Sequence, residues 1–252
     1  MKRLTPTTEK LLRRIILGII IGVSVVGVFV GGWGLFQWQR DSRANSALRE
    51  DIVRSATNDG AGTEEFRVDF EKLRGENADT VGYIRNKSLN IDYPVVKTGD
   101  NSYYLDHNFQ KEYNIAGWIF GDYRNRFDGT DRNLVIYGHN SYDENMFSLL
   151  SKTLEEEWRK VPENLIIELY TPSGPEEGVK YQVFSTYSYE AEDYYITTDF
   201  GSEEEYGRFL ETIRGRSNYD YGVEVGTGDQ IITLSSCTAD GRRRIVVHGR
   251  KI

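Results

Sequence analysis

The chain has 252 residues, with 31 basic and 39 acidic side chains and a formal net charge of −8. Outside its basic N-terminus the remaining chain carries a net charge of about −12, which argues against nucleic acid as a partner. One cysteine cannot form an internal disulfide, and with three scattered histidines it cannot complete a four-ligand zinc site without carboxylates. We therefore expect no metal and no other cofactor.

The first forty residues are typical of a membrane signal. No residue between positions 15 and 39 is charged, and Arg14 and Arg40 flank this run. A helix of that length spans about 37 Å, enough to cross a hydrocarbon core of about 30 Å. A cleaved signal peptide has a shorter apolar region and a small-residue cleavage site, for which residues 44–46 are a poor match. We predict a retained transmembrane anchor.

The charge on either side of this anchor predicts its orientation. Five basic residues and one glutamate precede it, which keeps the N-terminus in the cytoplasm and places the remaining domain outside. We expect four segments: a cytoplasmic N-terminus (1–14), a transmembrane anchor (15–39), an N-terminal helical extension (40–74) and a β-barrel domain (75–252).

Beyond the anchor, the hydrophobic pattern changes from helical to strand-like. Helices are expected over 41–56 and 66–73, separated by a glycine-rich break. From Val81 onward, short apolar and aromatic runs alternate with Gly, Asn and Asp, which is typical of an all-β barrel or sandwich. Two further helices interrupt this region, near 146–150 and over 202–213. The candidate strands are 81–84, 93–96, 116–120, 134–137, 165–170, 180–189, 230–235 and 244–249.

Three residues at predicted strand ends point to nucleophilic chemistry. Cys237 closes an apolar strand and has polar neighbours, which favours a reactive thiol over the buried packing role of most free cysteines. His139 follows another strand directly, and Arg244 opens the last one. A thiol, an imidazole and a guanidinium can act as nucleophile, base and anion-stabiliser.

The other histidines and arginines have plainer interpretations. Taken alone, His139 could equally be an ordinary surface histidine with no catalytic role. His107 has no strand context and is expected to be structural. His248 lies about 13 Å along the last strand from the arginine that opens it, so it is expected to be a barrel side chain. Arg242 and Arg243 are expected to be surface charges.

Several motifs in the right order resemble a class B sortase over residues 66–252. The most specific are Thr233-Leu234-Ser235-Ser236-Cys237, Tyr137-Gly138-His139-Asn140 and Arg244, supported by residues 77–84, 91–95, 101–105 and 117–122. The resemblance implies a mostly β fold, an eight-stranded sortase-type β-barrel with inserted helices, an N-terminal helical extension and one preceding transmembrane helix. It also implies a cysteine transpeptidase on the outer face of a Gram-positive membrane.

The same resemblance implies the partners and the site. Such enzymes cleave the C-terminal sorting signal of secreted surface proteins after a threonine and pass the acyl group to an amine of the peptidoglycan precursor or a pilin lysine. Cys237 would be the nucleophile, His139 the acid and base, and Arg244 the substrate and oxyanion contact. No calcium site is implied. The substrate-groove positions would be Asn101, Leu105, Tyr137, Tyr195, Ile196 and Ser235.

Two other classes of protein remain open at this point. One is another cell-wall cysteine peptidase or transpeptidase, although L,D-transpeptidases carry Ser-His-Gly before their cysteine and papain-like peptidases place cysteine before histidine. The other is a non-catalytic, membrane-anchored surface-binding domain in which Cys237 is incidental. Thiol reactivity separates these readings. The sequence does not specify the sorting motif, the acceptor amine, or a housekeeping, iron-acquisition or pilus role.

Overall fold

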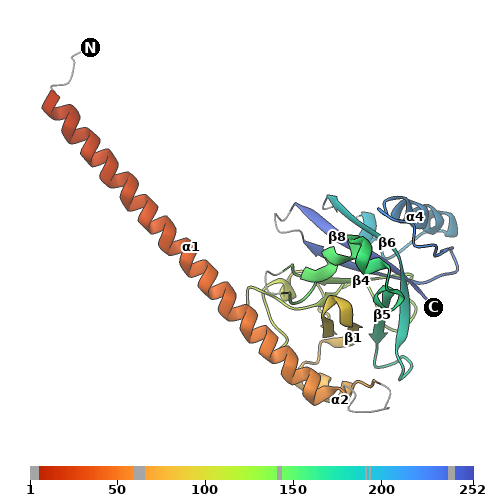
Figure 1. Cartoon of the computed structure of the whole chain (residues 1–252). Helices are drawn as coiled ribbons and strands as arrows, with labels where there is room; N and C mark the ends of the chain where they lie inside the picture. The colour runs from red at the N-terminus through yellow and green to blue at the C-terminus, as the bar shows by residue number, and fades with distance from the viewer. Residues whose placement is uncertain (1–5, 59–65, 141–143, 191, 193, 238–241) are drawn as a thin grey trace. The chain divides into compact units, whose positions relative to one another are not determined.

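The computed structural model describes residues 6–58, 66–140, 144–190, 192, 194–237 and 242–252, without the side chains of 6–12 and of Cys237. The chain divides into two compact units, Met1–Asp41 and Ser42–Ile252. The first unit is helical, and the second contains the sheet and the remaining helices (Figure 1).

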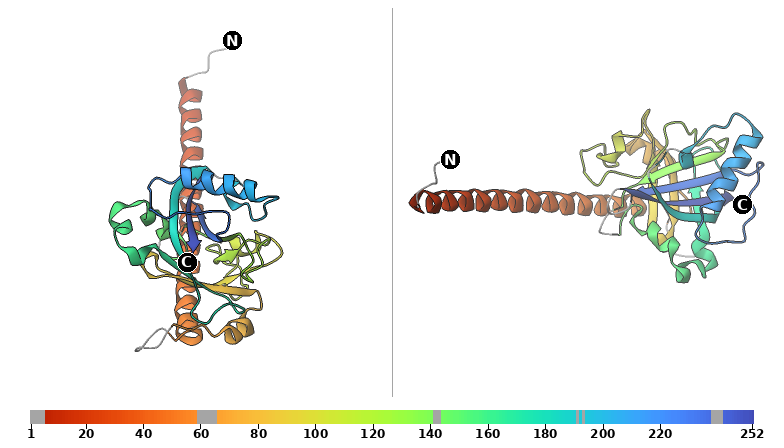
Figure 2. Two further views of the ribbon diagram at one scale, coloured as in Figure 1. Left: turned by 90° about the vertical axis from the view of Figure 1, so that its right-hand side faces the viewer. Right: turned by 90° about the horizontal axis from the view of Figure 1, so that it is seen from above.

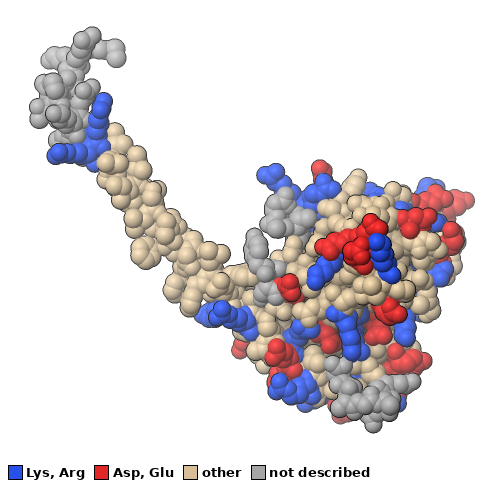
Figure 3. All heavy atoms as spheres, in the orientation of Figure 1, with Lys and Arg blue, Asp and Glu red and all other residues tan. Residues whose placement is uncertain are grey.

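Helix α1 (Pro6–Ala56) begins in the first unit and ends in the second. Within the described part of the chain, it is the helix long and apolar enough to cross a membrane. Its uncharged stretch forms a continuous tan surface (Figure 3). The predicted anchor and the predicted helix 41–56 belong to this one helix. The charged residues that begin at Arg40 do not end the helix, because no proline or glycine interrupts the pattern there.

The second unit is built on a closed eight-stranded barrel, which confirms the expected mostly β fold (Figures 1 and 2). The strands are β1 (Thr80–Asn86), β2 (Ile91–Val96), β3 (Phe120–Gly121), β4 (Asn133–Gly138), β5 (Ile166–Tyr170), β6 (Val179–Glu190), β7 (Ile231–Cys237) and β8 (Arg243–Lys251). Their order around the barrel is β1-β2-β3-β4-β7-β8-β6-β5. The pairs β2–β3 and β4–β7 are parallel, and the others are antiparallel.

The main core is formed by large apolar and aromatic side chains from the strands and their connections. Tyr83, Tyr93 and Trp118 are fully buried within it, and Ile52 and Ala56 of α1 belong to the same cluster. Full burial of an apolar side chain is worth about 1.5–3 kcal/mol. The last turns of α1 therefore stabilise the barrel directly.

Helix α4 (Glu203–Gly215) confirms the helix expected over 202–213. The Ser202 hydroxyl accepts a hydrogen bond from the Glu205 backbone N–H at 3.1 Å and caps the first turn. Three exposed glutamates follow, where the positive end of the helix dipole favours negative charge. The apolar face of α4 packs with residues of β6, β7 and β8 in a second core cluster, and Figure 2 shows the helix beside these strands.

The remaining helices are short. The helix expected over 66–73 begins only at Phe70, because Asp69 caps it by accepting from the Lys72 N–H at 2.9 Å. Phe66 lies before this helix and packs its ring 5.1 Å from that of Tyr170. The helix expected near 146–150 lies later, as η3. The short helices are α2 (Phe70–Glu76), α3 (Glu156–Arg159), η1 (Lys87–Leu89), η2 (Tyr103–Leu105), η3 (Ser148–Leu154), η4 (Pro162–Leu165) and η5 (Tyr194–Ile196).

The strand expected over 116–120 is wrong in its first four residues. Gly117 has a φ of +58°, and its N–H donates to the Asn114 carbonyl at 2.9 Å, which is a turn. The Trp118 N–H donates to the Tyr104 carbonyl at 2.9 Å. These backbone groups bond within a loop, so pairing in the sheet begins only at Phe120.

Candidate active site

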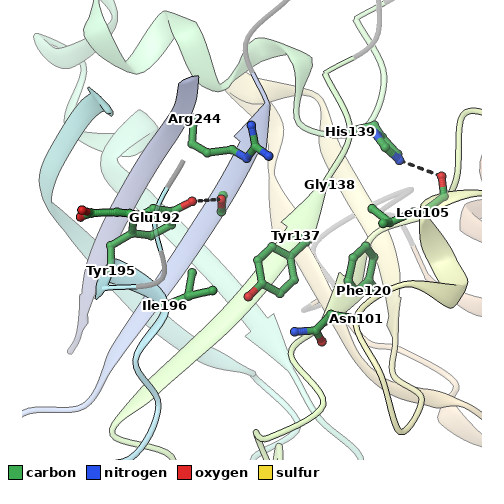
Figure 4. Close-up of a pocket in the computed structure, with 11 residues that line it drawn as sticks. Asn101, Leu105, Phe120, Tyr137, Gly138, His139, Glu192, Tyr195, Ile196 and Arg244 are labelled. Atoms are coloured by element: carbon green, nitrogen blue, oxygen red, sulfur yellow. Dashed lines mark hydrogen bonds between the residues drawn. The ribbon is translucent and has the colours of Figure 1, made fainter. Parts of the chain in front are cut away.

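A cavity of about 420 Å³ lies where β4 and β7 end and β8 begins, beside the loops around η2 and η5 (Figure 4). It collects all six predicted groove positions together with His139 and Arg244. Its lining residues are Asn101, Leu105, Phe120, Tyr137, Gly138, His139, Glu192, Tyr195, Ile196, Ser235 and Arg244.

His139 follows the last residue of β4 and is half-exposed. Its Nε2 lies 2.8 Å from the Leu105 carbonyl oxygen (Figure 4). A carbonyl only accepts, so Nε2 carries a proton, and in the neutral ring Nδ1 is the acceptor. Gly117 allows this approach, because a Cβ there would lie 2.8 Å from the His139 ring and 2.5 Å from the Tyr104 carbonyl oxygen.

Cys237 and Arg244 are register partners at the open ends of β7 and β8. The Cys237 side chain lies outside the described residues. Arg244 is half-buried, lines the cavity, and donates from Nη1 to the Arg243 carbonyl at 3.1 Å. Arg243 donates instead to the Ser188 hydroxyl on β6, at 3.0 Å. Arg242 and Arg243 are exposed, as expected.

The groove positions line the cavity from several separate elements. The hydroxyl of Tyr195, in η5, lies 3.2 Å from that of Ser235 in β7. Leu105 is 44% exposed and offers an apolar surface at the cavity. The Tyr137 ring packs against Phe120, with ring centroids 5.1 Å apart. Figure 4 shows Ile196 and Tyr195 facing the Tyr137 and Asn101 side across the cavity.

A buried carboxylate, Asp122, lies behind the side of the cavity formed by Tyr137 and Asn101. Asp122 accepts from the Tyr137 hydroxyl at 2.7 Å and from Asn101 Nδ2 at 3.0 Å. Burial acts to raise the pKa of Asp122, but hydrogen bonds from Arg124 outweigh it and hold the pKa below its usual value. Burial and then the charge of Asp122 raise the pKa of Tyr137, so its hydroxyl stays protonated and donates.

Sequence reasoning missed three lining residues, Phe120, Gly138 and Glu192. Phe120 stood within a quoted motif but was assigned no role. Gly138 precedes His139, and a Cβ there would lie 2.7 Å from the Phe147 ring, so glycine permits this packing. Glu192 pairs with Arg216 and gave no pattern in the sequence.

The other two histidines lie away from the cavity lining. His248 is fully buried in the barrel between the hydroxyls of Thr233 and Tyr187, at 2.8 and 2.9 Å. His107 stacks on the ring of Tyr103, with ring centroids 4.2 Å apart. Both environments agree with the structural roles expected for these two residues. Among the described residues, no cluster of three or more His, Cys, Asp or Glu side chains is placed to hold a metal ion.

This barrel with its cavity corresponds to a known class of enzyme. The model of the sortase domain family matches residues 84–252, and the chain belongs to the sortase family, in its class B. Members of this family are cysteine transpeptidases of the cell surface, and the chain is a sortase transpeptidase.

Particular relatives support this assignment over most of the chain. Sortase B of Listeria monocytogenes is 32% identical over 246 residues, covering 94% of this chain and 97% of the relative. The crystal structure of a Bacillus anthracis protein described as similar to sortase B is 36% identical, with a TM-score of 0.72, covering 85% of this chain and 97% of the other. A Staphylococcus aureus sortase B–substrate complex is 30% identical, with a TM-score of 0.71 and coverages of 85% and 97%.

Proposed function

We propose that this enzyme cleaves the C-terminal sorting signal of secreted surface proteins through a thioester. It then transfers the acyl group to an amine of the peptidoglycan precursor or to a pilin lysine. The observation that carries the proposal is one of position. His139 just after β4 and Arg244 in β8 line one cavity, and β7, which ends at Cys237, lies between those two strands.

In this reaction the Cys237 thiolate attacks the backbone carbonyl carbon of the threonine in the sorting signal. An unperturbed thiol has a pKa near 8.5, so a nearby imidazole or guanidinium must favour the thiolate. The C=O electron pair moves onto oxygen, and the guanidinium of Arg244 stabilises the resulting oxyanion. The C–N bond then breaks, and His139 gives the departing amine the proton that its Nδ1 took from the Cys237 thiol when the thiolate formed.

The second half of the reaction uses the same groups in reverse. The acceptor amine attacks the thioester, His139 takes the proton that the amine loses, and the thiolate of Cys237 leaves. Nδ1 of His139 is suited to both transfers, because Nε2 is bonded to the Leu105 carbonyl. Water in place of the amine would give hydrolysis, a cysteine endopeptidase side reaction.

The peptide would bind along Asn101, Leu105, Tyr137, Tyr195, Ile196 and Ser235. All six line the cavity, and the related S. aureus enzyme has been solved as a substrate complex. We also propose that residues 15–39 of α1 anchor the enzyme, with residues 1–14 cytoplasmic and the helical extension (40–74) and barrel (75–252) outside. The five basic residues before the anchor support that orientation.

The test uses the full chain in detergent micelles with a pentapeptide library and two acceptors, a glycine α-amine and a lysine side-chain amine. Mass spectrometry should detect peptides cut after threonine and joined to an acceptor. The Cys237→Ala variant should lose cleavage and transfer while keeping its melting temperature. Hydrolysis without transfer would favour a peptidase. Wild-type chain that cuts no peptide and resists thiol alkylation would favour a non-catalytic binding domain.

A further inference from the structure

An ion pair between a buried carboxylate, Asp122, and the partly exposed Arg124 contacts residues on both sides of the cavity. Asp122 follows β3 and its side chain is fully buried, while Arg124 is 35% exposed. Arg124 Nε donates to Asp122 Oδ1 at 2.8 Å, and Nη2 donates to Oδ2 at 2.7 Å. Such a two-pronged pair fixes both side chains in one plane. Neither residue is among those that line the cavity.

On one side the pair orients two groove residues. Asp122 Oδ2 accepts from Asn101 Nδ2 and from the Tyr137 hydroxyl. Asn101 Oδ1 accepts in turn from the Tyr123 backbone N–H at 2.9 Å. Both ends of the Asn101 amide are therefore fixed, which determines the face that it presents to the cavity.

On the other side the pair holds the η5 wall. Arg124 Nη2 donates to the backbone carbonyl of Ile196 at 2.9 Å. Ile196 and its neighbour Tyr195 line the cavity opposite Asn101 and Tyr137. The guanidinium of Arg124 thus sets the distance between the Ile196 side of the cavity and the side formed by Asn101 and Tyr137.

The charge of Asp122 is essential to this arrangement. Its two oxygens accept from Asn101, Tyr137, and the backbone N–H, Nε and Nη2 of Arg124. A carboxylate accepts on both oxygens, whereas an amide would turn a donor toward one of these donors. The pKa of Asp122 is lowered, so the carboxylate is the form present at neutral pH.

We propose that the Asp122–Arg124 pair determines which sorting peptides the groove accepts, by holding Asn101, Tyr137 and Ile196 at a fixed spacing. Both are positioning residues, since they act through side chains and a carbonyl at the cavity. The proposal rests on the proposed function. An ion pair that serves only the stability of the fold is the alternative.

Arg124→Met is the informative change, because Arg124 is partly exposed and its apolar stem is kept. In full-length enzyme in micelles, KM for the preferred peptide should rise on the order of tenfold, as expected for lost charge-assisted hydrogen bonds. Preference within the pentapeptide library should flatten at one peptide position and persist at the others. Arg124→Lys keeps the charge but not the forked pair of donors. It should therefore keep a melting temperature near that of the wild type without restoring the wild-type preference among peptides.

Arg126→Met is the matched control, since Arg126 is exposed, two residues away and outside the cavity lining. It should keep the wild-type KM and library profile. Alkylation of Cys237 should proceed at the wild-type rate in both methionine variants. Folded Arg124→Met with unchanged preferences, or with all peptides slowed by one common factor, overturns the positioning role. Wild-type enzyme that cleaves no library member overturns the proposed function itself.

Discussion

Two histidines, one just after a barrel strand and one within a strand, lie in opposite environments. His139 follows the end of β4, half-exposed at the cavity, with one ring nitrogen on the Leu105 carbonyl. His248 lies within β8 and is fully buried. Both rings are oriented by hydrogen bonds, so orientation alone does not distinguish a candidate acid and base from a structural residue.

The difference lies in solvent access and in the partners of the second nitrogen. The Thr233 hydroxyl donates to Asn133 Oδ1 at 2.6 Å, so it must accept from His248 Nδ1, leaving Nε2 to accept from Tyr187. Burial, and then the positive charge of Arg216, lower the pKa of His248 to about 3. His248 is thus held neutral with both nitrogens engaged. A histidine at a strand end keeps access to substrate that one inside a barrel strand loses.

The largest expected effect separates these two rings. His139→Gln should lower kcat/KM for a sorting peptide by about 10²–10⁴, the usual contribution of a general acid–base, with little change in Tm. His248→Gln should lower Tm by several degrees, because a buried hydrogen-bonded group is disturbed. Its kcat/KM well below that Tm should stay near wild type. The reverse pattern would assign the acid and base to the buried ring.

The second prediction concerns the arginines beside the cavity. Arg244→Lys keeps the charge but loses the guanidinium fork, so kcat should fall on the order of 10²-fold, as for loss of one oxyanion contact. Arg243→Ala is the control, since Arg243 bonds Ser188 on β6 and does not line the cavity. Steady-state kinetics on one peptide measure both. A crippled Arg243→Ala with normal Arg244→Lys would exchange the two roles.

The third prediction is a pH dependence of stability from the buried ring. Unfolding frees His248, whose pKa returns from about 3 toward 6.5, so the unfolded chain binds one more proton between these values. Stability from this group is therefore complete above pH 6.5 and falls as pH drops toward 3, by a few kcal/mol. Denaturant unfolding of wild type and His248→Gln between pH 7 and 4 measures it. Parallel curves would refute the depressed pKa.

Much of this comparison was accessible from the sequence. The sequence pattern predicted that Cys237, His139 and Arg244 lie at strand ends, because period-two alternation and flanking Gly, Asn and Asp are local signals. Seven of the eight expected strands agree with the observed ones within a few residues. The residue roles stay predictions.

What the sequence did not predict depends on contacts between distant segments. Residues 116–119 stay outside the sheet partly because the Trp118 N–H bonds to the Tyr104 carbonyl in η2, which no local apolar run reveals. The role of Asp122 as an acceptor for Asn101 and Tyr137 requires three segments to meet. Glu192 reaches the cavity from the segment after β6 and shows no periodic pattern.

The smallest expected effect concerns the N-terminal part of α1. Removing residues 1–40 should leave Tm and kcat/KM as in the full chain, because Met1–Asp41 is a separate compact unit and the barrel has its own core. Removing 1–56 should instead lower Tm, since Ile52 and Ala56 are buried in that core.

The longer deletion should also act more strongly on the His139 end than on the His248 end. Asn45 of α1 donates to the Gly117 carbonyl at 2.8 Å, and Gly117 lies against the His139 ring. The His248 network is formed by β4, β6, β7 and β8, none of which is deleted. Below the new Tm, the 1–56 deletion should therefore lower kcat/KM while keeping the pH slope of stability. Asn45→Ala in the 1–40 deletion removes this contact together with the two hydrogen bonds that join Asn45 and Asn114. Unchanged kinetics in this variant would show that the hydrogen bonds of Asn45 do not support the His139 end.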